Sequence, residues 1–218
     1  MTCIIAIDGP AASGKGTLAS RVADELGFVH LDTGALYRSV AKRVIDQGED
    51  PDDERAAKKA AMWLQDNANS DVLSDPDLKG DDIGVAASKV AGFSGVRKAL
   101  LDLQRSFAKS PGNGYEGAIL DGRDIGTVIC PNADVKLFIE ASAEVRAERR
   151  TKELQSKGIE ATYDAVLRDM RERDERDTNR QDAPLACAKD AIVLDTSDLS
   201  LDEAFGKALE IIKEQFSS

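Results

Sequence analysis

The segment GPAASGKGT, residues 9–17, matches the pattern G-x-x-x-x-G-K with Gly9, Gly14 and Lys15 at its fixed positions. It follows an isoleucine-rich run, CIIAID, and precedes a helical pattern, which is the strand–loop–helix context that the motif requires. Glycines let backbone N–H groups turn toward one point, the helix N-terminus adds partial positive charge, and the lysine adds a full one. The segment therefore predicts a phosphate-binding loop for a nucleotide. The alternative is a glycine-rich turn with an exposed lysine, which this specific context disfavours.

The residue after the lysine departs from the commonest form of the motif. A serine or threonine usually stands there and its hydroxyl meets Mg²⁺, but here Gly16 is followed by Thr17. The magnesium contact can therefore differ from that of a GTPase or an ATPase motor. The loop alone does not distinguish a kinase from a switch or a motor. The residues predicted to bind ATP are Gly9, Pro10, Ala11, Ala12, Ser13, Gly14, Lys15, Gly16 and Thr17.

The composition narrows the possible classes of protein. The chain has 218 residues and a formal net charge of −11, which argues against a general nucleic-acid binder but leaves room for a small anionic ligand. No apolar run approaches the roughly 20 residues that span a bilayer, and the first residues lack a basic leader, so no membrane partner is expected. Three cysteines without CxxC spacing favour a reducing, cytoplasmic location. The single histidine, His30, supports neither a zinc site nor a Ser-His-Asp triad.

Strand and helix patterns alternate along the chain. Short apolar runs at 3–8, 28–31, 118–121, 135–140 and 191–195 predict five strands. Helical patterns separate them, and two highly charged helices are expected at 142–155 and 162–177. Ser200 and Glu203 form an S-x-x-E capping box before the last helix. The alternation predicts an α/β fold with a parallel sheet that helices cover on both faces.

Four motifs together resemble a known family. GKGT in place of GK[ST] is similar to the nucleoside monophosphate kinases. LDTGALYR (31–38), DGRDIGT (121–127) and RERDERDTNR (171–180) with APL (183–185) then closely resemble the bacterial cytidylate kinases over nearly the whole chain. DGRD and the ERD-x-RD-x-NR pattern distinguish the cytidylate kinases, because adenylate kinases share the phosphate-binding loop but lack these two motifs.

The resemblance implies a three-layer P-loop NTPase fold, in which a five-stranded parallel sheet carries a monophosphate-binding excursion and a lid. Residues 1–218 then form one kinase domain, with its core at 1–32, 110–141 and 190–218, the monophosphate-binding region at 33–109 and the lid at 142–189. The implied reaction transfers the γ-phosphoryl group of ATP, with Mg²⁺, in line onto CMP or dCMP. Such catalysis depends on positioning and charge stabilisation, so arginines are expected on several elements. We expect a monomer.

The resemblance also implies roles for individual residues, with Lys15, Arg123 and Arg173 as the catalytic set. Arg38 and Arg123 would grip the CMP phosphate, since a guanidinium binds phosphate through two hydrogen bonds. Thr17 and Asp121 would hold Mg²⁺, Asp121 through water. Taken singly, each of these residues has an ordinary surface, packing or turn-capping explanation. The residues implied to bind CMP are Thr33, Tyr37, Arg38, Ser88, Arg97, Asp121, Gly122, Arg123, Asp124, Arg173, Asp177 and Arg180.

Two segments carry further expectations. Arg146, Arg149 and Arg150 cluster on one charged helix, which fits a mobile lid that closes over the transferring phosphate, although a salt-bridged surface hairpin is the alternative. Asp174 and its acidic neighbours in 171–175 match no family position and are expected to face solvent. Segment 66–80 is short and poor in strand formers, so we expect a reduced insert or mostly loop there.

Two other functions stay open at this point. One is another small-molecule P-loop kinase, such as an adenylate or shikimate kinase, which would share the fold and the phosphate-binding loop. The other is a nucleotide-dependent switch that binds ATP without transferring its phosphate. A GTPase is disfavoured because the chain has no N-K-x-D motif for guanine.

Overall fold

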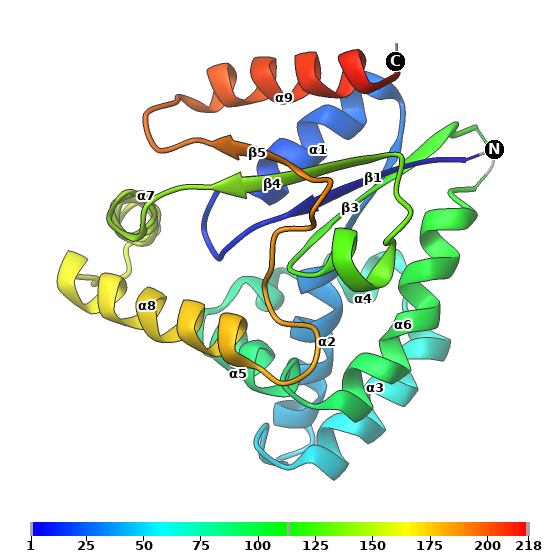
Figure 1. Ribbon diagram of the computed structural model, residues 1–218. Coiled ribbons are helices and arrows are strands. Elements are labelled where there is room, and N and C mark those ends of the chain that lie inside the picture. Colours follow the sequence, from blue (N-terminus) through cyan, green and yellow to red (C-terminus); the bar gives the residue numbers. More distant parts are fainter. Residues whose placement is uncertain (1, 113, 217–218) are drawn as a thin grey trace.

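The structure is a computed structural model that describes residues 2–112 and 114–216. Its centre is one sheet of five parallel strands in the order β2-β3-β1-β4-β5 (Figure 1). The strands match the five apolar runs of the sequence to within a residue or two at each end. They are β1 (Cys3–Asp8), β2 (Val29–Asp32), β3 (Gly117–Gly122), β4 (Val135–Glu140) and β5 (Ile192–Asp195).

Helices cover both faces of the sheet, so the fold has the three layers that were expected. Side chains alternate along β1: Ile5 and Ile7 pack with Leu18 of α1 (Lys15–Leu26) and Ile212 of α9 (Leu201–Phe216). Ala6 faces the other way, into a cluster built from α2 (Thr33–Asp46), α3 (Glu54–Asn67), α5 (Asp81–Val90) and α6 (Ser94–Lys109). Both clusters are buried, which explains why the strands are continuous apolar runs.

The segment 66–80, expected to be a reduced insert or mostly loop, holds short helical turns. Helix α4 (Ser70–Leu73) and a 3₁₀ turn (Pro76–Lys79) occupy it, and no described residue between them forms a strand. Asn69 Oδ1 accepts a hydrogen bond from Val72 N at 3.0 Å, and Asp75 Oδ1 accepts one from Asp77 N at 2.9 Å. Side-chain caps of this kind stabilise single turns that have no apolar period.

The two charged helices form a hairpin beside the sheet, at the left of Figure 1. Helices α7 (Ala143–Ser156) and α8 (Tyr163–Asn179) share a small core of Ala147, Leu154, Val166 and Met170. At the start of α9 the predicted capping box is confirmed: Glu203 Oε2 accepts from Ser200 N at 2.9 Å, and Ser200 Oγ accepts from Glu203 N at 3.3 Å.

Substitution of Gly9, which directly follows β1, tests the close packing there, and Gly206 of α9 serves as the control. Gly9 has φ of 154°, and a Cβ there would lie 2.2 Å from the carbonyl oxygen of Ile139. Because that contact is with backbone, we expect Gly9→Ala to lower the free energy of unfolding by about 2 kcal/mol or more. Gly206, inside α9, has nothing within 4 Å of the same position. We expect Gly206→Ala to raise stability by about 0.5–1 kcal/mol.

Urea unfolding of both variants, followed by circular dichroism, measures the two changes. Gly206→Ala is the control for the general effect of exchanging glycine for alanine. An unchanged midpoint for Gly9→Ala would show that the loop moves away from β4 without cost, and that the close approach is not a constraint.

Candidate active site

The phosphate-binding loop has the geometry of an anion site. Gly14 has a left-handed φ of 86°, and α1 begins at Lys15 without a side-chain cap, so its first N–H groups point toward open space in the loop. The Lys15 side chain is buried, with Nζ 3.3 Å from the Pro10 carbonyl oxygen. Burial, followed by the nearby charge of Arg123, lowers the pKa of Lys15 to about 7. An anion in the loop would restore the lysine's charge.

Strand pairing brings the DGRD loop beside the phosphate-binding loop. Asp8 lies opposite Gly122 in the β1–β3 register, and Asp32 lies opposite Asp121 in the β2–β3 register. The Asp8 carboxylate then uses both oxygens, accepting from Ile125 N at 2.8 Å and Gly126 N at 2.7 Å. Burial raises the pKa of Asp8 to about 6. Asp8 was not among the residues predicted for the site, and its only signal in the sequence is its place directly before Gly9.

Three of the predicted arginines surround a point next to Lys15. Arg123 Nε donates to Asp177 Oδ2 at 2.9 Å, and Arg38 pairs with Asp32 at 3.3 Å. Arg173 Nε is buried and has no hydrogen-bond partner in the described part of the chain. Burial, and then the positive charges of Arg123 and Arg38, lower the pKa of Arg173 to about 10. Crowded cations with an unused donor indicate a site for an anion.

The predicted base-binding residues form a second group beyond these arginines. Arg97 and Asp124 make a buried ion pair, and the Arg97 guanidinium lies 5.4 Å from the centre of the Tyr37 ring. Arg180 Nε donates to the Ala183 carbonyl at 2.8 Å, and Thr33 Oγ1 donates to the Asp121 carbonyl at 2.8 Å.

Several polar atoms of this second group are buried without a partner. Within the described ranges they include Ser88 Oγ and one terminal nitrogen of Arg180. Ser88 lies one turn after Gly84 on α5, and an added Cβ at Gly84 would lie 3.9 Å from Arg173 Nη1. This places Ser88 on the helix face toward α8. Unused buried donors and acceptors are costly, so they mark where a polar ligand fits.

Asp121 is the acid that best fits a magnesium-bound nucleotide. Its side chain is almost fully buried, and an added Cβ on Gly16 would lie 3.8 Å from Oδ2, so that oxygen faces the phosphate-binding loop. Thr17 lies in the first turn of α1 and is exposed. The described residues hold no group of three or more His, Cys, Asp or Glu that could bind a metal ion. A single acid suits Mg²⁺, which keeps water and phosphate ligands.

His30 also belongs to this site, although the sequence analysis gave it no role. Its Nε2 lies 2.7 Å from Asp121 Oδ1. The two residues are 91 positions apart, and only the β2–β3 pairing brings them together.

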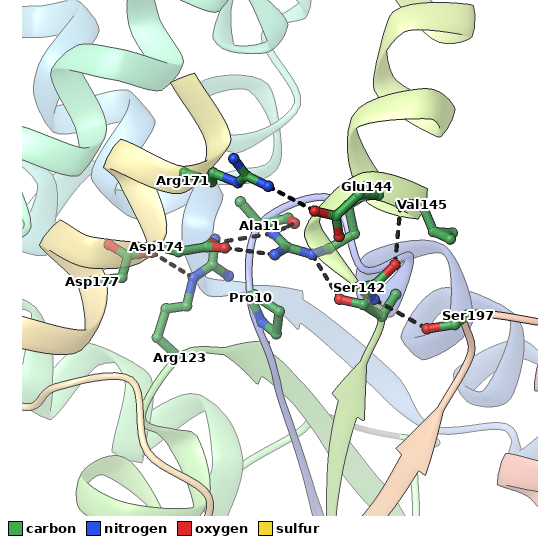
Figure 2. A network of polar contacts seen from close by, with 12 residues as sticks. Pro10, Ala11, Arg123, Ser142, Glu144, Val145, Arg171, Asp174, Asp177 and Ser197 are labelled. Atoms are coloured by element: carbon green, nitrogen blue, oxygen red, sulfur yellow. Dashed lines mark hydrogen bonds and ion pairs between the residues drawn. The ribbon is translucent and has the colours of Figure 1, made fainter. Parts of the chain in front are cut away.

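The three arginines of α7 are paired with protein groups in this structure, and their expected part in a lid over the transferring phosphate stays a prediction. Arg146 donates to the carbonyl oxygens of Ala11 at 3.0 Å and Ala141 at 2.9 Å, and makes two contacts with Asp174 at 3.1 and 2.5 Å (Figure 2). Asp174 therefore does not face solvent as expected, because it pairs across the hairpin. Figure 2 also shows Arg171 reaching Glu144.

The other two arginines of α7 are bound to nearby structure as well. Arg149 donates to the carbonyl oxygens of Thr196 at 2.6 Å and Leu199 at 3.2 Å, and Arg150 pairs with Glu153 at 2.7 Å. The alternative of a salt-bridged hairpin describes this part of the chain better. The cations grouped around Lys15 and Arg173 come from α1, α2, α8 and the loop after β3.

Comparison with known proteins agrees with this geometry. A family model described as cytidylate kinase matches residues 5–214. A cytidylate kinase from Paramagnetospirillum magneticum is 61% identical over 97% of this chain and 98% of its own, and one from Rhodospirillum rubrum is 56% identical over 96% of each.

Solved structures of lower similarity share the fold. A shikimate kinase from Bacteroides thetaiotaomicron has a TM-score of 0.51 at 12% identity and covers 100% of both chains. An uncharacterised protein from Eubacterium ventriosum has a TM-score of 0.53 at 13% identity and covers 100% of this chain and 99% of its own.

None of the helices in the described ranges is long and apolar enough to cross a membrane. By its full-length match and its P-loop α/β fold, the chain belongs to the cytidylate kinase family and is a nucleoside monophosphate kinase.

Proposed function

We propose that the protein transfers the γ-phosphoryl group of Mg²⁺-bound ATP directly onto the phosphate of CMP or dCMP, giving CDP or dCDP. The observation that carries this proposal is the buried, partnerless Nε of Arg173 among Arg38 and Arg123, next to Lys15. Two sets of cations that lie side by side suit two phosphates about to react. The full-length family match excludes adenylate and shikimate kinases as this chain's family.

The donor side of the site is the loop 9–17. Backbone N–H groups and Lys15 hold the β- and γ-phosphates, while Thr17 and, through water, Asp121 hold Mg²⁺. Bound Mg²⁺ would neutralise charge that develops on the transferring group. The chain's own contribution is to fix the phosphates in line with the acceptor and to keep Lys15 charged.

The acceptor side binds the monophosphate by its three chemical parts. Arg38, Arg123 and Arg173 hold the phosphate, and Ser88 and Asp177 hold the sugar. The Arg97–Asp124 pair, with Thr33 and Arg180, matches the edge of cytosine, because a carboxylate accepts from its amino group and a guanidinium donates to its ring nitrogen and carbonyl. Tyr37 packs beside the base, and Gly122 lets the loop after β3 pack closely against Thr33 and Ile125. Uracil lacks the amino group, so this arrangement favours cytosine.

The larger divisions of the chain follow from the same proposal. Segments 1–32, 110–141 and 190–218 form the core, 33–109 binds the monophosphate, and 142–189 acts as a lid that excludes water. One chain supplies both sides of the site, so we also propose a monomer. Three free cysteines and the use of ATP support a cytoplasmic location.

A panel of acceptors tests the proposed substrate. We expect CMP and dCMP to be phosphorylated much faster than UMP or AMP in an assay coupled to ADP formation. Uracil has no amino group for Asp124, and adenine, which has one, is a larger purine with no ring carbonyl to accept from the guanidinium. Faster transfer to AMP would contradict the assignment of the base-binding residues. ATP binding without transfer to any of the four would support the nucleotide-dependent switch instead.

Removal of Arg123 tests the acceptor phosphate site. We expect Arg123→Ala to lower kcat/KM for CMP by about two to three orders of magnitude, because a charged bidentate contact at the reacting phosphate is lost. ATP binding measured by calorimetry should stay nearly intact. Arg168→Ala is the control for removing an arginine, since Arg168 is 70% exposed on α8 and lies outside the loop after β3. Equal loss of CMP turnover and ATP affinity would indicate a structural role for Arg123.

The lowered pKa of Lys15 predicts proton uptake on ATP binding. In the protein without ATP, Lys15 loses its proton as the pH rises through about 7. A bound polyphosphate favours the protonated form of Lys15, so a proton is taken up when ATP binds. Calorimetry at about pH 8 in two buffers of different ionisation enthalpy should show about one more proton taken up than Lys15→Met takes up. At about pH 6 the unmodified chain and Lys15→Met should take up the same number of protons on binding ATP. Equal proton uptake at both pH values would mean that Lys15 is fully charged before ATP binds.

A further inference from the structure

The contact between His30 and Asp121 has no part in the function proposed so far. His30 is the only histidine of the chain and lies on β2. In the parallel register it faces Ile119, so its ring reaches along β3 toward the strand end, where Asp121 lies. Nε2 of His30 and Oδ1 of Asp121 are 2.7 Å apart, and the side chains are 19% and 4% exposed. The contact is therefore shielded from water.

The two oxygens of the Asp121 carboxylate have different surroundings. Oδ1 meets His30, whereas Oδ2 faces Gly16 at the first turn of α1. Thr33 donates to the backbone carbonyl of Asp121 and leaves the carboxylate alone. In the described ranges, His30 is the one hydrogen-bond partner of this carboxylate. The orientation of Oδ2 therefore depends on a single contact.

We propose that His30 is a positioning residue, which donates from Nε2 to Asp121 Oδ1 and so holds Oδ2 toward the phosphate-binding loop. An ionised carboxylate only accepts, so the ring nitrogen at 2.7 Å must carry the hydrogen. Without this bond the carboxylate of Asp121 turns about its last side-chain bond, and that rotation has broad energy wells. Outer hydrogen bonds that fix a metal-binding acid are known to affect metal affinity strongly. This proposal rests on the role of Asp121 toward Mg²⁺–ATP given above.

A single histidine makes the hydrogen bond directly measurable. Long-range ¹H–¹⁵N correlation spectra of the full chain contain one imidazole, so no assignment by mutation is needed. We expect hydrogen on Nε2, with an N–H proton that exchanges slowly enough to be seen. In Asp121→Ala that proton signal should vanish. A neutral ring that carries its hydrogen on Nδ1, or an Nε2 proton indifferent to Asp121→Ala, would overturn the proposal. This experiment does not depend on which reaction the protein catalyses.

Two variants distinguish the loss of the His30 hydrogen-bond donor from the loss of the volume of its ring. His30→Gln keeps an N–H donor near the place of Nε2, while His30→Leu keeps apolar volume and removes the donor. The readout is the factor by which Mg²⁺ tightens ATP binding in calorimetry, with ATP and EDTA as the reference. We expect His30→Leu to reduce this factor about tenfold and His30→Gln to stay within about twofold of the unmodified chain. The KM for CMP and the affinity for ATP in EDTA should not change.

Each other outcome contradicts the inference. If both variants keep the full Mg²⁺ effect, the hydrogen bond does not position Asp121. If both lose it equally and also unfold at lower urea, His30 is a structural residue of β2. If CMP is not a substrate of the unmodified chain, the proposed function fails, while the ATP-binding and spectroscopic results still decide the role of His30.

Discussion

The buried carboxylate of Asp8 is the interaction on which the site depends. It ends β1, directly before the phosphate-binding loop, and its two oxygens hold the N–H groups of Ile125 and Gly126 across the sheet. Burial of the charge is unfavourable, as the raised pKa of Asp8 shows, and two charge-assisted hydrogen bonds offset it. The loop that holds the donor phosphates and the loop that holds Arg123 are therefore fixed to each other before any ligand arrives. Reactions that depend on positioning need such a frame.

The monophosphate-binding helices and the charged hairpin are both attached to this part of the structure. Asp124 holds Arg97 of α6, and Arg123 holds Asp177 of α8, so one short loop after β3 reaches both the monophosphate-binding helices and the charged hairpin. On the other side of the site, Arg146 joins α8 to the carbonyl of Ala11 in the phosphate-binding loop. The hairpin is thus attached at both sides of the reaction centre. A movement of α8 would change the surroundings of both Arg123 and the Ala11 carbonyl.

The sequence was sufficient for features that are local or periodic. The strands, the helices and the capping box at Ser200 follow from runs of a few residues, and the phosphate-binding loop follows from glycines at fixed spacing. The contacts that organise the site are pairs of distant residues: 117 positions separate Asp8 from Ile125, and 91 separate His30 from Asp121. No local pattern identifies such pairs. Asp174 was misplaced for the same reason, since helical spacing shows which residues share a face but not which neighbour they meet.

The pairing of Arg123 with Asp177 places a carboxylate beside the proposed phosphate site. Burial alone would raise the pKa of Asp177, but Arg123 and Arg180 hold it below its usual value, so the carboxylate stays charged and occupies the guanidinium. Asp177 uses only Nε of Arg123, so in the proposed function a phosphate on the other guanidinium nitrogens would lie beside a carboxylate. A nucleotide brings a phosphate for the arginine and hydroxyl or amino groups for the acid at once. Hydrogen bonds from those groups to Asp177 would offset the repulsion between the phosphate and the carboxylate.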